Sequence, residues 1–152
     1  MQTSQIQIPE PLRAEHAEIH GALVRATEAP GAVGAAARAL AAVLHAHFER
    51  EEEIALPPLG LLAPLARGEF TPDMMEVLPL TDALRAELPQ MLEEHKAVQS
   101  ATTALGEAAR AAGDRPVAAL AEALALHARS EEEVFYPAAV LVGDIVRSRG
   151  GS

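Results

Sequence analysis

The stretch HFEREEEIALP, residues 47–57, aligns without gaps on HARSEEEVFYP, residues 127–137. Each copy begins with His-x-x-x-Glu and reaches a proline six residues after the glutamate. A further histidine precedes each copy at nearly the same distance, His16 in the first half and His95 in the second. The repeat predicts a chain built from a duplicated helical hairpin.

Proline and glycine divide the chain into four predicted helices, because proline disfavours helix in the residue before it and glycine ends helices readily. The predicted helices cover residues 9–28, 32–56, 82–112 and 115–136, and the fourth can continue past Pro137 to Arg147. Pro89 lies inside the third segment, so we expect a kink or a late helix start there. The predicted domain covers residues 9–147, after an N-terminal tail at 1–8 and before a disordered tail at 148–152.

Apolar residues recur at steps of three and four along these segments, which is the spacing of a helix face that packs in a bundle. In the fourth segment the predicted buried face is Val117, Leu120, Leu124, His127, Glu131, Val134, Ala138 and Leu141. Aromatic residues, which are enriched in strands, make up only 3% of the chain, so the composition disfavours strands. We therefore predict an all-α fold, an antiparallel up-and-down four-helix bundle.

Composition and charge exclude several classes of partner and ligand. Twelve Lys and Arg against 22 Asp and Glu give a net charge of −10, which disfavours binding to a nucleic-acid backbone. No apolar run reaches the roughly 20 residues that span a bilayer, and no targeting signal is evident, so a cytoplasmic protein is expected. The chain has no cysteine, so any bound metal must be held by nitrogen and oxygen.

The two His-x-x-x-Glu motifs place histidine and glutamate on the predicted buried face. Residues i and i+4 of a helix lie on the same side, so His47 and Glu51 point together toward the bundle axis, as do His127 and Glu131. A carboxylate among leucines loses several kcal/mol of solvation unless it is paired or binds a metal. No Lys or Arg occupies these faces. The pattern therefore predicts a site for two cations.

A coordination count suggests how many ligands this site needs. Two octahedral ions offer about twelve positions; two bridging carboxylates take four of them and one oxygen bridge takes two. Five histidines would leave one position open for a small ligand. His16, His47, His95 and His127 are four, and His20, one turn beyond His16, is the natural fifth. Imidazole with carboxylate suits iron best, with manganese, cobalt and zinc not excluded.

These residues resemble the hemerythrin-like, or HHE cation-binding, domains over residues 9–140. The resemblance implies a four-helix bundle around a non-haem di-iron centre, bridged by Glu51, Glu131 and an oxo or hydroxo group. Oxygen-carrying hemerythrins have His-x-x-x-His on the third helix, where this chain has His95 followed by Gln99. They also use an aspartate five residues after the last histidine, where this chain has Glu131 at four. The differences favour redox or sensing roles over reversible oxygen carriage.

Three functions follow as hypotheses. The first is a di-iron protein that binds or reduces oxygen, nitric oxide or peroxide for sensing, storage or detoxification, with weak oxidase, peroxidase or catalase-like turnover left open. The second is iron storage or buffering without turnover. The third is a metal-free helical adaptor that uses the apolar segment at residues 56–65, for which a lid, a homodimer patch and ordinary packing are all open.

Several residues near the motifs are expected to lie outside the site. His45 falls on a different helix face from His47 and is predicted to be exposed. The other glutamates of the two triplets are predicted to be solvated, with the alternative that one of them is an outer hydrogen-bond partner of a ligand: Glu52, Glu53, Glu132 and Glu133. Tyr136 has no assigned role.

Overall fold

The computed structural model describes residues 5–151, and every regular element in this part of the chain is helical. The long helices are α1 (Glu10–Thr27), α2 (Gly31–Arg50), α4 (Leu78–Ala112), α5 (Arg115–Ser130) and α6 (Tyr136–Gly150). The shorter elements are two π-helical segments (Glu51–Ala55 and Glu131–Phe135), two 3₁₀ helices (Pro57–Leu61 and Pro72–Val77) and α3 (Leu62–Ala66).

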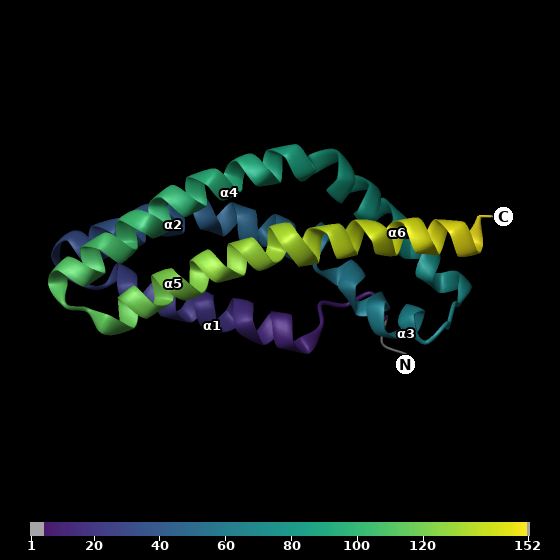
Figure 1. Cartoon of the computed structure of the whole chain (residues 1–152), viewed down its shortest axis with the longest axis horizontal. Helices are drawn as coiled ribbons and strands as arrows, with labels where there is room; N and C mark the ends of the chain where they lie inside the picture. Colours follow the sequence, from purple (N-terminus) through teal and green to yellow (C-terminus); the bar gives the residue numbers. More distant parts are fainter. Residues whose placement is uncertain (1–4, 152) are drawn as a thin grey trace.

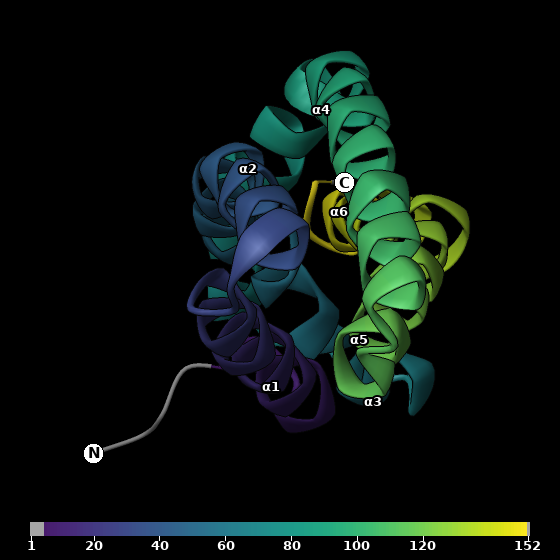
Figure 2. The ribbon, with the colours of Figure 1, turned by 90° about the vertical axis from the view of Figure 1, so that its left-hand side faces the viewer.

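Helices α1, α2, α4 and α5 form the bundle. Seen along the bundle, α1 and α2 lie on one side and α4 and α5 on the other (Figure 2). Neighbouring helices around the bundle contact each other, which includes the pair α1 and α5 that closes the ring. Helix α6 continues almost in line with α5 and extends beyond the bundle, where α3 and the 3₁₀ helices pack beside it (Figure 1). The predicted all-α four-helix bundle is confirmed.

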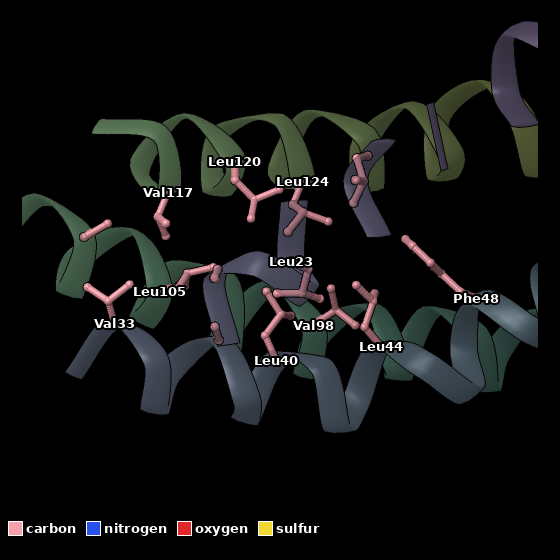
Figure 3. Packing of buried hydrophobic residues seen from close by; sticks show 14 residues of the cluster. Leu23, Val33, Leu40, Leu44, Phe48, Val98, Leu105, Val117, Leu120 and Leu124 are labelled. Atoms are coloured by element: carbon pink, nitrogen blue, oxygen red, sulfur yellow. The ribbon is translucent and has the colours of Figure 1, made fainter. Parts of the chain in front are cut away.

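The bundle core lies between the α1–α2 and α4–α5 connections at one end of the bundle and the histidines in the middle of the molecule. Leu120 and Leu124 on α5 point toward Leu40 and Leu44 on α2, with Leu23 of α1 between them in this view (Figure 3). All five belong to one buried cluster. A second buried cluster on the far side of the histidines includes Leu56, Leu84, Met91 and Tyr136. The polar side chains of the middle layer are therefore enclosed by apolar residues on both sides.

Each copy of the repeat contains a π-helical segment that begins at the motif glutamate. The backbone N–H of Leu56 donates to the carbonyl of Glu51, 2.9 Å away, and the N–H of Tyr136 donates to the carbonyl of Glu131. These bonds span five residues rather than four. π-Helical turns are rare and occur frequently at functional sites.

The π segment changes which face of the fourth helix is buried. Val134 and Leu141, predicted to be buried, are 55% and 56% exposed. Beyond Glu131 the buried residues are instead Tyr136, Ala139, Val142 and Val146. The prediction was wrong there because the wider turn advances the chain by one extra residue, so the regular steps of three and four no longer describe the buried face.

The third helix begins earlier than predicted and passes through its proline. Helix α4 starts at Leu78 rather than Asp82 and contains Pro89, so a late start after Pro89 is wrong. Its ribbon bends in the N-terminal third (Figure 1), as expected for a helix that contains a proline.

The C-terminal helix is also longer than predicted. Residues 148–150, predicted to be disordered, belong to α6; Ser152 lies outside the described residues. The helix is held by tertiary contacts, because Val146 is fully buried and the Arg147 guanidinium binds Asp82 at 2.8 Å. The Arg149 guanidinium also lies over the Phe70 ring, 5.8 Å from its centre.

The segments outside the bundle pack on the chain itself. At the N-terminus, Ile6 and Ile8 pack against buried clusters, although they were predicted to lie in a tail; residues 1–4 are not described. In the apolar connection, Leu59 and Leu61 are buried and Leu62 is 43% exposed. Most of this connection is therefore packed against α6 as part of the ordinary core. Within residues 5–151, no helix combines the length and the apolar character needed to span a bilayer.

Candidate metal centre

Six of the seven predicted ligands meet in the buried middle layer of the bundle. Each of the four bundle helices supplies one histidine, and each π segment supplies its first glutamate. All six side chains are exposed by 5% or less: His16, His47, Glu51, His95, His127 and Glu131. The repeat explains this placement, since the two hairpins bring equivalent residues to one level from opposite sides.

The six residues form two overlapping groups of potential ligands. The first consists of His16, Glu51, His127 and Glu131, and the second of His47, Glu51, His95 and Glu131. Within each group, one ligand atom from every residue lies within 4.8 Å of all the others. Glu51 and Glu131 belong to both groups, which is the arrangement of carboxylates that bridge two metal ions.

The two oxygens of each shared glutamate face different groups. For Glu51, Oε1 lies 2.6 Å from Nε2 of His47, and Oε2 lies 4.0 Å from Nε2 of His16. For Glu131, Oε1 lies 3.2 Å from Nε2 of His95, and Oε2 lies 3.1 Å from Nε2 of His127. Each carboxylate thus offers one oxygen to each group.

The buried carboxylate oxygens fit metal ions better than they fit the neighbouring histidines. Among the described residues, both carboxylate oxygens of Glu51 and Oε2 of Glu131 have no hydrogen-bond partner, although a histidine nitrogen is near. The short contact between Glu51 Oε1 and His47 Nε2 therefore lacks hydrogen-bond alignment. Buried carboxylates without such partners cost several kcal/mol. Carboxylate oxygens that converge on one place without hydrogen bonds are expected where ligands surround a cation.

The family model of the hemerythrin HHE cation-binding domain matches residues 7–139. The chain belongs to this family. No curated protein and no solved structure matches the chain. In this HHE domain the matched region contains all six clustered residues, so the family's cation-binding character and the buried cluster agree.

A ring of outer carboxylates orients the histidines of this HHE domain. His47 and His95 direct Nδ1 to Glu94 and Glu132, at 2.8 Å and 2.9 Å. His127 Nδ1 contacts Glu15 in the same way. An Nδ1–H that donates to a carboxylate leaves Nε2 free to bind a metal and makes it more basic. The fourth pair is looser, with Glu52 Oε2 3.5 Å from Nδ1 of His16.

Two of these outer residues, Glu15 and Glu94, were missed by the sequence analysis. A signal was present in the repeat, because Glu15 directly precedes His16 in the first half and Glu94 directly precedes His95 in the second. Each contacts the histidine of another helix, however, so helix spacing alone does not reveal the contact. Glu132, predicted to be solvated, fulfils the alternative of an outer partner, with 30% of its side chain exposed.

Burial favours the neutral imidazole that binds metal. Burial, and next the nearby His47, lower the pKa of His95. Burial and next the nearby His16 lower the pKa of His127. At His47 burial acts in the same direction, but contacts with Glu51 and Glu94 outweigh it and raise the pKa.

Tyr136 enters the cluster although the sequence analysis assigned it no role. Its hydroxyl lies 3.0 Å from Nε2 of His95 and 3.3 Å from Nε2 of His47, and its side chain is 1% exposed. Burial, and next the charge of Glu51, raise the pKa of this phenol well above its ordinary value. The π turn places it there, since a regular helix would turn this position away from Glu131.

His20 does not join the cluster. It is exposed and belongs to neither group, which corrects its placement as the fifth histidine. The buried face of α1 runs through His16, Ile19 and Leu23, so His20 flanks this face instead of lying on it. His45 is exposed as predicted, and its Nε2 lies 3.1 Å from Glu49.

Proposed function

We propose that this protein holds a non-haem di-iron centre that binds or reduces a small ligand, namely oxygen, nitric oxide or peroxide, at an open iron coordination position. The observation that carries the proposal is the division of Glu51 and Glu131 between the two histidine groups, with one oxygen of each carboxylate on each side. Two cations would supply the charge that these buried carboxylates lack.

The donor set favours iron. Four imidazoles and two carboxylates, with no thiolate in the chain, suit iron(II) and iron(III) among redox metals. Manganese and zinc accept the same donors, so metal analysis decides among them.

The protein's own residues would bind, orient and shield the ions. The histidines hold the ions through Nε2, and Glu94, Glu132 and Glu15 fix the orientation of the rings. The ring of Phe48 stacks on that of His16 at 4.4 Å and helps keep the site dry. Bound iron would supply a redox-active position for a diatomic or peroxide ligand.

Binding and turnover are separable in this proposal. A sensor or store binds its ligand stoichiometrically, whereas detoxification consumes peroxide or nitric oxide catalytically. The adaptor hypothesis is disfavoured, because most of the apolar connection it would use is buried within the chain. A cytoplasmic location, the absence of nucleic-acid and membrane partners, and a homodimer stay predictions.

The test is anaerobic purification followed by metal analysis and visible absorption spectra before and after addition of oxygen or peroxide. We expect two iron ions per chain and a spectrum that changes on oxidation. Fewer than about one metal ion per chain would overturn the proposal, because a two-metal site needs both ions. Assays of peroxide and nitric oxide consumption then separate turnover from binding, and iron retention without either reaction would favour storage.

A further inference from the structure

The internal repeat pairs Tyr136 with Leu56. Each directly follows a π segment, and each is 1% exposed. In both, the backbone N–H donates to the carbonyl of the motif glutamate. The two side chains differ completely in chemistry: one carries a hydroxyl and the other only methyl groups. The two halves of the cluster are therefore unequal at this position.

The Tyr136 hydroxyl belongs to the half that contains His47 and His95. It lies 3.3 Å and 3.0 Å from their Nε2 atoms, which are the atoms available for metal binding. In the repeat, His47 corresponds to His127 and His95 corresponds to His16. The residue that corresponds to Tyr136 on the side of His16 and His127 is thus Leu56, which offers no donor atom.

The number of protein donors then differs between the halves. One group has two histidines, two glutamate oxygens and the Tyr136 hydroxyl, and the other has two histidines and two glutamate oxygens. With one shared oxygen bridge, about six positions are filled in the first half and about five in the second, given octahedral ions. A single open position results, without a fifth histidine.

Two surface hollows are lined by histidines of the half with fewer donors. A hollow of about 450 Å³ between α1 and α5 is lined by His127 and Glu15. Another of about 380 Å³ between α1 and α2 is lined by His16 and Phe48. Each hollow therefore borders one histidine of the half with fewer donors.

We propose that Tyr136 is a ligand of the metal held by His47 and His95, and that a small exogenous ligand binds at the metal held by His16 and His127. The inference rests on the proposed di-iron function. On binding, the phenol oxygen forms a bond to the metal and its proton passes to solvent, with no change in oxidation state. Tyr136 closes one metal position, and Leu56 leaves the other open.

The first test is the visible spectrum of the diferric protein. We expect a phenolate-to-iron(III) charge-transfer band in the wild type that disappears in Tyr136→Phe, while both iron ions stay bound. A wild type that holds two iron ions but lacks this band, or a variant that keeps it, would overturn the role of Tyr136 and leave the di-iron proposal intact. A wild type without two iron ions would overturn both.

The second test uses azide as the exogenous ligand of the diferric protein. The wild type should bind one azide per pair of iron ions. Tyr136→Leu makes the two halves alike and should raise this ratio to two. Leu56→Tyr should weaken azide binding at least tenfold at unchanged iron content and helical circular dichroism. If Leu56→Tyr loses iron, the azide ratio of Tyr136→Leu decides, and a ratio that stays at one overturns the assignment of the open position.

Discussion

The backbone N–H of Tyr136 donates to the carbonyl of Glu131, five residues earlier in the chain. This π turn determines which face of α6 is buried. It turns the Tyr136 side chain toward His47 and His95, and it exposes Leu141 while burying Val142. Leu56 and Glu51 form the same bond in the first copy, so the wider turn is a property of the repeat.

The change of buried face predicts a large effect of substitution at one residue and a small effect at its neighbour. Val142→Ala removes buried methyl groups and should lower the free energy of unfolding by roughly 2 kcal/mol. Leu141→Ala, on the exposed side, should change it by less than about 0.5 kcal/mol. Chemical denaturation measures both values, and a larger loss for Leu141→Ala would contradict the π-helical assignment.

The proposed bridging role of the two carboxylates predicts that removal of their charge causes loss of metal. Glu51→Gln and Glu131→Gln keep the side-chain size but remove a negative ligand, so we expect less than one metal ion per chain by elemental analysis. His45→Ala, in an exposed residue, should keep two. Retention of both ions in either glutamine variant would argue against bridging.

In the metal-free protein, Glu51→Gln should raise the stability of the fold. Glu51 is fully buried, and its two oxygens lack hydrogen-bond partners among the described residues, so the metal-free chain buries a carboxylate without hydrogen bonds. Metal-free Glu51→Gln should be more stable than metal-free wild type by about 1–3 kcal/mol. Thermal unfolding in the presence of chelator measures this, and a less stable variant would contradict the role assigned to burial.

The outer carboxylates predict weaker metal binding without loss of the ligands. Glu94→Gln removes the negative charge that receives His47 Nδ1–H and should weaken metal affinity by about 10–100-fold, measured by competition with a chelator. Glu133→Gln is the control, because Glu133 is exposed and contacts Arg129 rather than a histidine. Equal affinities for the two variants would remove Glu94 from the site.

Close packing of α4 and α6 predicts different effects for two glycines. A Cβ at Gly143 would lie 2.6 Å from Cβ of Thr81, so Gly143→Ala should lower the free energy of unfolding by about 1–3 kcal/mol. At Gly21 in α1 an added Cβ meets only the end of the Arg25 side chain, at 3.5 Å. Gly21→Ala should therefore raise stability by about 0.5–1 kcal/mol. Thermal unfolding that ranks the two variants the other way would contradict this packing.

The existence of the helices and the burial of six of the seven predicted ligands followed from local patterns. The steps of three and four place His16, His47 and His95 on buried faces, and the repeat brings the two motifs into register. The same rule failed for His20, because a position one turn from a ligand can flank the buried face rather than lie on it. It failed beyond Glu131 because helix spacing assumes regular four-residue hydrogen bonds.

The sequence by itself determined the helical bundle, the nitrogen and oxygen donor set and the two shared carboxylates, since these depend on residue type and on spacing within single helices. Only the tertiary structure decided which histidines converge in one group, which outer glutamate contacts each ring, and that Tyr136 enters the cluster. Those relationships join residues on different helices, and the π turns that set them are not encoded by the spacing of apolar residues. The physical reason is that helix crossing and backbone hydrogen-bond register are settled by packing of the whole bundle.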